Sequence, residues 1–324
     1  MKIVVTRRIP DAGIEVLTRQ FGAGPVRMHQ EEMAPARPEL LKMLEGASAV
    51  LSTVTEKMDA EAMDAAGPGL KVIANMAVGY DNIDLGEAAS RNIRVTNTPG
   101  VLTDATADLA WTLILGTARR AGEAGRCLRA GAWPGWGPMQ FLGMSVHGCT
   151  LGIFGMGRIG QAVARRARGF DMKVLYHDTQ RLSPEVEADL NARQVDKETL
   201  LRESDILSIH CPFLPETRHA FTLEEFRKMK PTAILINTSR GPVVKEADLC
   251  AALNQGLIFG AGLDVYEREP EVYPPLLREE RAFLLPHLGS ATVETRSIMA
   301  RMAADNIIAV LSGGEALNPV RLPN

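Results

Sequence analysis

Three short segments in the last third of the chain carry the side chains best suited to chemistry. They are Thr238–Gly241, Glu269–Pro270 and Pro286–Ser290. Arg240, Glu269 and His287 supply a guanidinium, a carboxylate and an imidazole, each beside a glycine or proline that turns or restricts the backbone. A guanidinium can grip a carboxylate and polarise a nearby carbonyl, and an imidazole paired with a carboxylate can exchange a proton near pH 7.

Each of the three residues also has an ordinary explanation when it is taken alone. Arg240 could be a surface arginine on a turn, His287 a core or surface histidine, and Glu269 a solvated loop acid. Glu267 and Glu271 are nearby glutamates that could be mistaken for the functional one, and are here called decoys. Together they carry more weight, because reduction of a ketone by hydride requires a proton donor for the new alkoxide. Together with a dinucleotide site, the set predicts hydride transfer to or from a 2-oxo acid.

A glycine-rich turn lies upstream of these segments. Gly155, Gly157 and Gly160 form the pattern G-x-G-x-x-G between an expected strand at 151–154 and an expected helix at 158–169. The first glycine permits the tight turn, the second lets the backbone approach a pyrophosphate, and the third lets the helix pack against the strand. The pattern and its context predict a dinucleotide site at the amino end of the helix.

The choice of dinucleotide depends on Asp178, which follows the next expected strand at the usual distance of about 20 residues. A carboxylate there accepts hydrogen bonds from ribose hydroxyls and repels a 2′-phosphate, which favours NAD(H). Arg181 lies three residues further on and could instead receive that phosphate, so NADP(H) remains possible.

Composition narrows the class of protein. A chain of 324 residues with 46% hydrophobic and 23% charged residues is typical of a globular protein with two domains. Its net charge of -3 argues against a nucleic-acid or anionic-membrane surface, and no apolar run is long enough for a membrane span. The four cysteines lack C-x-x-C spacing and are expected to be free thiols in the cytoplasm; we predict no metal site.

Short apolar runs alternate with amphipathic stretches in two blocks, one before and one after Asn97–Gly100. We expect strands at 2–6, 49–52, 71–75, 94–96, 150–154, 173–176, 205–209, 233–237, 257–263 and 283–285. We expect helices at 11–20, 38–45, 59–66, 102–120 and 292–311, with a tryptophan-bearing loop at 131–138. The pattern predicts an α/β protein with two doubly wound parallel-sheet domains.

Several ordered motifs resemble those of the D-isomer-specific 2-hydroxyacid dehydrogenases, and within that family the glyoxylate/hydroxypyruvate reductases. Besides the segments above, they include Ala77–Asn82, Thr98–Gly100, Thr106–Asp108, Gly131–Trp133 with Trp136, and Asp264–Tyr266. The resemblance spans nearly the whole chain. It implies a Rossmann-type NAD(P)-binding domain at 99–287, inserted in a flavodoxin-like substrate domain made of 1–98 and 288–324.

The resemblance also implies roles for individual residues. Arg240 would orient the substrate and polarise its carbonyl, His287 would be the acid/base, and Glu269 would pair with His287. The substrate would be bound by Val78, Gly79, Arg240, His287 and Ser290. The cofactor would be bound by Thr106, Gly155, Gly157, Arg158, Ile159, Gly160, Asp178, Cys211, Thr238, Asp264 and Gly289.

The implied activity is NAD(P)H-dependent reduction of glyoxylate or hydroxypyruvate to glycolate or D-glycerate, and the reverse. A homodimer is implied as well, with Trp136 either reaching the partner's active site or packing in the interface. The alternative from another class is a corepressor-type protein of the same fold, in which binding of NAD(H) drives assembly rather than turnover.

Overall fold

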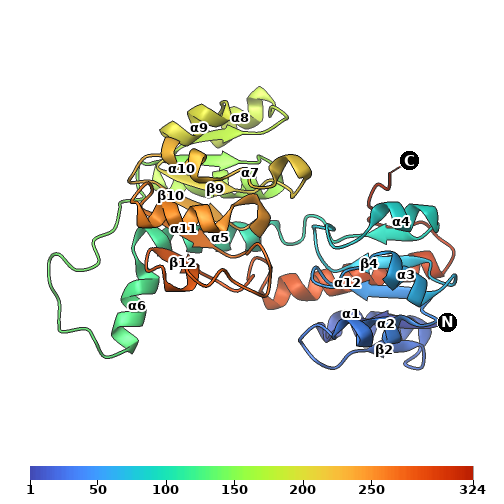
Figure 1. Ribbon diagram of the computed structural model, residues 1–324. Coiled ribbons are helices and arrows are strands. Elements are labelled where there is room, and N and C mark those ends of the chain that lie inside the picture. Colours follow the sequence, from blue (N-terminus) through green and yellow to red (C-terminus); the bar gives the residue numbers. More distant parts are fainter. Residues whose placement is uncertain (324) are drawn as a thin grey trace. The chain divides into compact units, whose positions relative to one another are not determined.

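The structure is a computed structural model that describes residues 1–323, and it divides into two compact units. The first unit contains Met1–Leu102 and Ser290–Asn324, and the second contains Thr103–Gly289. Each unit is built around its own parallel sheet with helices on both faces, as Figure 1 shows. This is the α/β class with two doubly wound sheets that the sequence predicted, and the prediction is confirmed.

The sheet of the first unit has five parallel strands in the order β2-β1-β3-β4-β5. Their bounds are β1 Ile3–Val5, β2 Val26–Met28, β3 Ala49–Ser52, β4 Val72–Asn75 and β5 Arg94–Thr96. This is the flavodoxin-like strand order. All residues of β1, β3 and β4 are buried, because helices cover the sheet on both sides.

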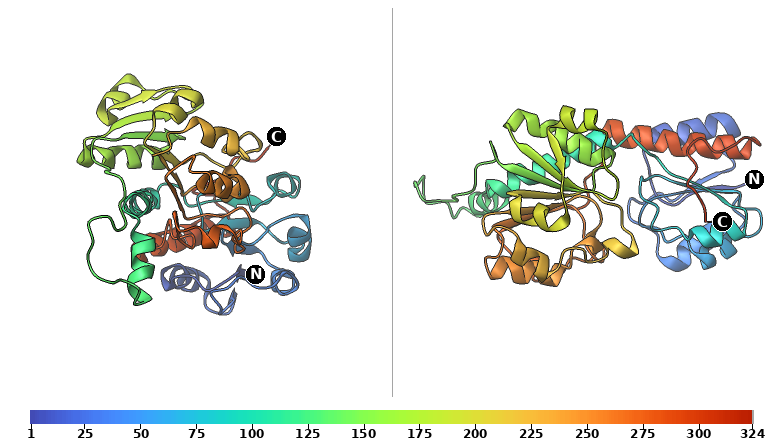
Figure 2. Two further views of the ribbon diagram at one scale, coloured as in Figure 1. Left: turned by 60° about the vertical axis from the view of Figure 1, so that its left-hand side comes forward. Right: turned by 90° about the horizontal axis from the view of Figure 1, so that it is seen from above.

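Five helices within the described part of this unit form its two covering layers, visible from above in Figure 2. They are α1 Asp11–Phe21, α2 Arg37–Leu44, α3 Ala60–Ala66, α4 Leu85–Ser90 and α12 Val293–Leu311. Ile3 and Val5 pack with α1 and α12, whereas Val4 packs with the helices of the opposite face. Gly13 allows the close contact of α1 with α12, since a Cβ there would lie 2.7 Å from the Ala300 carbonyl oxygen.

The sheet of the second unit has seven parallel strands in the order β12-β11-β10-β9-β6-β7-β8. Their bounds are β6 Thr150–Phe154, β7 Lys173–His177, β8 Ala192–Gln194, β9 Ile206–Ile209, β10 Ile234–Asn237, β11 Gly260–Leu263 and β12 Ala282–Leu284. The order reverses between β6 and β9. Ligands of open α/β sheets bind outside the carboxyl ends of the strands at such a switch point.

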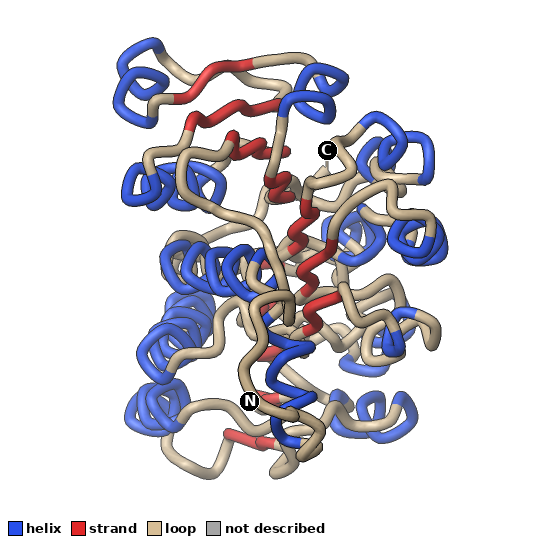
Figure 3. Tube along the Cα trace, turned by 90° about the vertical axis from the view of Figure 1, so that its left-hand side faces the viewer, coloured by secondary structure: helices blue, strands red, loops and turns tan. Residues whose placement is uncertain are grey.

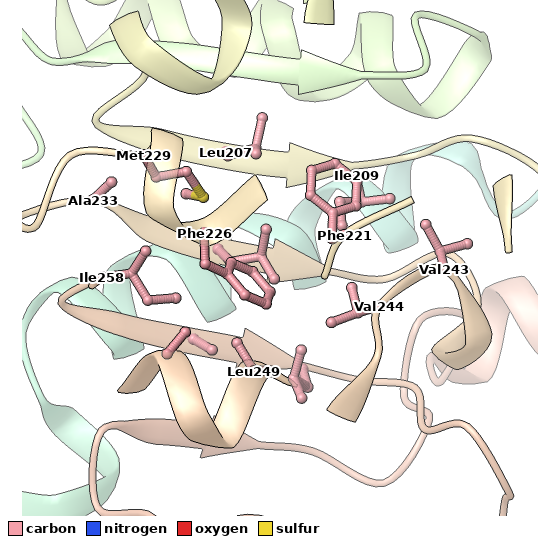
Figure 4. Packing of buried hydrophobic residues seen from close by; sticks show 14 of the residues in the cluster. Leu207, Ile209, Phe221, Phe226, Met229, Ala233, Val243, Val244, Leu249 and Ile258 are labelled. Atoms are coloured by element: carbon pink, nitrogen blue, oxygen red, sulfur yellow. The ribbon is translucent and has the colours of Figure 1, made fainter. Parts of the chain in front are cut away.

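Two apolar layers bury this sheet, and Figure 3 shows strands running between helices on both sides. One layer contains α5 Thr103–Ala118, α7 Arg158–Ala167 and α8 Pro184–Leu190; the other contains α9 Lys197–Glu203, α10 Leu223–Lys228 and α11 Glu246–Asn254. Figure 4 shows the second layer, where Leu207 and Ile209 of β9 share a cluster with Phe226 and Leu249. Because both faces are covered, the strand ends are the part of the sheet left for a ligand.

Helix α6, Ala121–Arg129, and the segment after it lead away from the seven-stranded sheet (Figure 1). Short 3-10 turns complete the unit at Arg168–Phe170, Pro215–Thr217, Gly241–Val243 and Leu276–Arg278. Among the helices within residues 1–323, none is both long and apolar enough to cross a membrane.

The element boundaries differ from the sequence prediction in a few places. β11 begins at Gly260 rather than at Leu257, because Leu257 still belongs to the turn after α11, where its N–H bonds to the Ala252 carbonyl. β12 ends at Leu284 rather than at Leu285. The edge strands β2 and β8 were not predicted; each has three residues, and neither is fully buried.

Candidate active site

The predicted cofactor residues of the second unit gather at the carboxyl edge of its sheet. Gly155, Asp178, Thr238 and Asp264 directly follow β6, β7, β10 and β11, and Cys211 and His287 lie shortly beyond β9 and β12. All seven strands are parallel, so these ends share one edge.

The three glycines of the turn are required for three different reasons. Gly155 has a φ of 97°, and a Cβ there would lie 2.5 Å from the Cys211 nitrogen. A Cβ on Gly160 would lie 2.3 Å from the Gly155 carbonyl oxygen. Among residues 1–323, nothing lies within 4 Å of a Cβ at Gly157, and no side chain caps α7 there. The open space and the uncapped helix end fit a pyrophosphate.

The Asp178 carboxylate is fixed at the end of β7. It accepts hydrogen bonds from the Met156 N–H, at 2.6 Å, and from the Gln180 N–H, at 3.0 Å. Arg181 forms two hydrogen bonds with Glu187, the shorter at 3.0 Å. That arginine is 68% exposed, and exposed ion pairs contribute little stability, so the pair is easily broken.

Asp264 ties the segment after β12 to the end of β11. Its carboxylate accepts hydrogen bonds from the N–H groups of Leu288, at 2.6 Å, and Gly289, at 2.8 Å. Thr106 at the start of α5 donates to the Gly289 carbonyl, at 3.0 Å. Burial raises the pKa of Asp264 to about 6, although the two N–H donors and His287 favour the charged form. Three predicted cofactor residues thus form one hydrogen-bonded group.

His287 and Glu269 form a direct pair, with His287 Nδ1 lying 2.7 Å from Glu269 Oε2. The other carboxylate oxygen accepts the Tyr266 N–H, at 3.0 Å. His287 has a φ of 54°, in the left-handed region, and its N–H bonds to the Asp264 carbonyl. Burial alone would raise the pKa of Glu269, but the hydrogen bond and charge of His287 outweigh it and hold this pKa below its usual value.

Arg240 is held beside this pair by its own backbone. Its carbonyl accepts a hydrogen bond from the Asn237 side-chain amide, at 3.0 Å. The next residue, Gly241, lies against the Tyr266 backbone so closely that a Cβ would be 1.8 Å from the Tyr266 carbonyl carbon. The positive charge of Arg240 also contributes to the lowered pKa of Glu269. The second unit therefore brings Arg240, Glu269 and His287 together.

The other predicted substrate residues belong to the first unit. Val78 and Gly79 lie in the loop after β4, and Ser290 lies just before the N-cap of α12. The Val78 and Gly79 carbonyls each accept a hydrogen bond from an asparagine amide.

Two histidines near these strand ends were not predicted. Glu267, considered a decoy from sequence, pairs with His219 at 2.6 Å, and its N–H bonds to the buried carboxylate of Glu246 at 2.8 Å. Burial lowers the pKa of His210 to about 3, and its Nε2 lies 2.8 Å from Ser208 Oγ. His210 directly follows an expected strand, a signal that could have identified it; no local pattern links His219 to Glu267. Among the described residues, no group of His, Cys, Asp and Glu side chains could hold a metal ion.

Comparison with known proteins gives concordant results. The family described as D-isomer specific 2-hydroxyacid dehydrogenase, NAD binding domain, matches residues 111–289. A glyoxylate reductase from Thermococcus litoralis is 49% identical over 96% of this chain and 94% of its own length.

Solved structures agree. A glyoxylate reductase from Paecilomyes thermophila has a TM-score of 0.85 and 34% identity, covering 99% of this chain and 98% of that one. An NADPH-dependent glyoxylate/hydroxypyruvate reductase from Sinorhizobium meliloti, in complex with NADP and malonate, has a TM-score of 0.84 and 36% identity, covering 98% and 96%.

The glycine turn yields a paired prediction. Gly157→Ala should leave the melting temperature nearly unchanged but weaken NADH binding at least tenfold, because its methyl group would enter the open space beside α7. Gly160→Ala should instead lower the stability by about 1–3 kcal/mol, because its methyl group would collide with the Gly155 carbonyl. Thermal unfolding and fluorescence titration with NADH measure both effects. Native-like binding by Gly157→Ala would contradict the assignment of the pyrophosphate site.

Proposed function

Because the chain belongs to the D-isomer-specific 2-hydroxyacid dehydrogenase family, we propose that it reduces glyoxylate and hydroxypyruvate with NAD(P)H. The products would be glycolate and D-glycerate, and the reverse reaction would oxidise them. The observation that carries the proposal is the 2.7 Å contact of His287 Nδ1 with Glu269 Oε2, close to the charge of Arg240. The glyoxylate reductases among its relatives support the same substrate class.

The pairing of His287 decides which nitrogen exchanges the proton. Glu269 engages Nδ1, so Nε2 is the nitrogen that gives a proton to the substrate oxygen. Glu269, whose pKa is held below its usual value beside His287, orients the ring. When bound, the reduced nicotinamide supplies the hydride. His287 thus acts as general acid in reduction and as general base in oxidation.

Arg240 binds the substrate carboxylate and polarises the carbonyl, because a guanidinium offers a fork of donors with a fixed charge. We assign the remaining carboxylate contacts to backbone N–H groups at Val78 and Gly79, together with Ser290. In this proposal the first unit is the substrate domain and the second is the nucleotide domain, with divisions near residues 98 and 287.

The residues that we assign to the cofactor lie mainly at the carboxyl edge of the seven-stranded sheet. We assign the pyrophosphate to Gly155, Gly157 and the first turn of α7, including Arg158 and Ile159, with Gly160 closing the turn. Asp178 would bind the adenosine ribose. Thr106, Cys211, Thr238, Asp264 and Gly289 would line the nicotinamide end. NAD(H) is favoured because Asp178 carries a carboxylate at the ribose position, and NADP(H) remains possible.

The alternative function is that of a corepressor, a protein of the same fold that would bind NAD(H) without catalysing a reaction. The relatives described above carry the names of reductases, and nothing in the comparisons supports a corepressor. A corepressor would bind NAD(H) and respond to it, but it would not oxidise NADH when a 2-oxo acid is added. One assay of NADH oxidation therefore distinguishes a corepressor from a reductase.

We also propose a homodimer. A group of exposed apolar side chains lies on α6 and the segment after it. The group consists of Leu128, Trp133, Trp136, Met139 and Leu142. Trp136 is 83% exposed, and a monomer rarely leaves so much apolar surface in one segment open to water.

The four free cysteines fit a cytoplasmic location.

The function is tested by mixing the purified protein with NADH or NADPH and a panel of glyoxylate, hydroxypyruvate, pyruvate and phenylpyruvate. We expect loss of NAD(P)H absorbance, with the highest kcat/KM for glyoxylate or hydroxypyruvate. In the same assay, His287→Ala should lower kcat by about 10²–10⁴, the usual contribution of general acid–base catalysis.

Glu269→Gln and Glu267→Gln provide a matched pair within that experiment, since both remove one carboxylate from the same loop. The first should reduce kcat strongly because it ends the charge pairing with His287, whereas the second, which faces His219, should change it less than threefold or so. A protein that binds NADH but oxidises it with none of the four acids would favour the corepressor alternative.

Cofactor preference is tested with Asp178→Asn. This change keeps an acceptor for the Met156 N–H but removes the negative charge, so KM for NADPH should fall about tenfold while KM for NADH changes less. Arg181→Ala is the control. If NADPH is already preferred and Arg181→Ala removes that preference, then the arginine, not the aspartate, decides the choice.

The dimer is tested by analytical ultracentrifugation. The native protein should sediment with the mass of two chains, and Leu128→Glu should shift it toward the monomer, because a charge buried in an interface is costly. Leu277→Glu is the matched control, since that leucine is similarly exposed, at 63% against 60%, but lies outside α6 and the segment after it. An unchanged dimer in Leu128→Glu, or dissociation by both variants, would rule out this interface.

A further inference from the structure

We propose that Asn75 and Asn97 are positioning residues for the loop Ala77–Asp81, and that they hold it ready to bind the carboxylate of a 2-oxo acid. The proposal rests on the proposed function and adds two residues to it. Both asparagines and the loop belong to the first unit, so every contact in the argument lies within that unit.

Three successive carbonyl groups of the loop are each held by one donor. The Thr98 N–H donates to the Ala77 carbonyl, at 2.8 Å. The Asn97 side-chain amide donates to the Val78 carbonyl, at 2.8 Å, and the Asn75 amide donates to the Gly79 carbonyl, at 2.9 Å. No carbonyl in this run is left to rotate freely.

Fixing the carbonyls also fixes the N–H groups. In a trans peptide, the carbonyl of one residue and the N–H of the next point in opposite directions. The N–H groups of Val78, Gly79 and Tyr80 therefore point away from Thr98, Asn97 and Asn75 respectively. The three tethers together determine the direction of three consecutive donors.

These donors are available for a ligand. Within residues 1–323, the N–H groups of Val78, Gly79 and Tyr80 have no hydrogen-bond partner, and all three residues are at least partly exposed. Consecutive backbone N–H groups form an anion site without a charged side chain. A carboxylate, with two oxygens and several lone pairs, matches such a row of donors.

The asparagines are themselves held firmly. Asn75 is fully buried at the end of β4, and its Oδ1 accepts the Ser52 hydroxyl at 3.0 Å. Its amide nitrogen also donates to Asn82 Oδ1, at 3.1 Å. Asn97 directly follows β5, the neighbouring strand of the sheet. An aspartate at either position could not donate and would place a negative charge behind the anion site, so the amide is the group required.

The test uses the full-length protein and the variant Asn97→Ala, chosen because Asn97 is half-buried and its loss should not prevent folding. We expect KM for glyoxylate to rise about tenfold, the effect of one lost hydrogen bond on binding. The change in kcat should be smaller, and the Kd for NADH should remain the same. The Kd for oxalate, measured by calorimetry on the NADH-loaded protein, should rise by the same factor as KM.

Three controls separate positioning from general destabilisation. Asn92→Ala makes the same chemical change in the same unit at a left-handed backbone position, where asparagine is favoured, whereas the side chains that hold the Val78 and Gly79 carbonyls are those of Asn97 and Asn75. It should lower stability without changing KM or oxalate binding. Glyoxal carries an aldehyde in place of the carboxylate, so native protein and Asn97→Ala should reduce it equally slowly. Asn97→Gln, which restores an amide, should recover part of the lost affinity.

The outcomes distinguish this proposal from the proposed function. If the native protein reduces glyoxylate and binds oxalate, and Asn97→Ala does both equally well, the positioning role is wrong while the function stands. If the native protein neither reduces any 2-oxo acid nor binds oxalate, the proposed function fails and this proposal falls with it. A rise in KM for glyoxal as large as for glyoxylate would also overturn the proposal, because the effect would not concern the carboxylate. Asn75→Ser, where it folds, should behave as Asn97→Ala does.

Discussion

The hydrogen bond between His287 and Glu269 is the interaction around which the second unit is organised. His287 reaches it from the segment after β12, and Glu269 from the loop after β11. Each partner is fixed by further contacts: Asp264 holds the residues that follow His287, and the Tyr266 N–H holds the second oxygen of Glu269. The pair therefore depends on backbone placement more than on the two side chains themselves.

The parallel sheet explains why such distant residues meet. Each strand of the second unit delivers its next residues to the same edge, and the reversal of order between β6 and β9 places the glycine turn against Cys211. Gly241 adds a local condition. Only a residue without a side chain lets the Arg240 segment lie against the Tyr266 backbone, so the guanidinium and the carboxylate come within electrostatic range of one another.

Much of this arrangement could be predicted from the sequence, because it depends on local patterns. Alternating apolar runs indicated the two parallel sheets, and the glycine spacing with Asp178 indicated the dinucleotide turn. The candidate residues Arg240, Glu269 and His287 were recognisable from their place near strand ends and from family resemblance. Their assigned roles are still proposals.

What sequence could not supply is the meeting of residues that no pattern connects. Glu267 was considered a decoy, yet it bonds to His219, which lies in a loop far upstream. The edge strands β2 and β8 are too short to produce an alternating signal. The tethering of the loop after β4 by two side-chain amides was equally hidden, since asparagines near strand ends are common and their partners are set by the fold.

The concentration of chemistry at one edge leaves the amino-terminal edge of the same sheet without any proposed site residue. The turn before β10, with Pro231 and Thr232, is exposed there. A peptide tag, a fluorescent label or a surface linker attached at that turn would lie at the opposite ends of the strands from the glycine turn. The second unit thus offers an attachment point for immobilising the protein on a support through the end of the sheet that carries no proposed site residue.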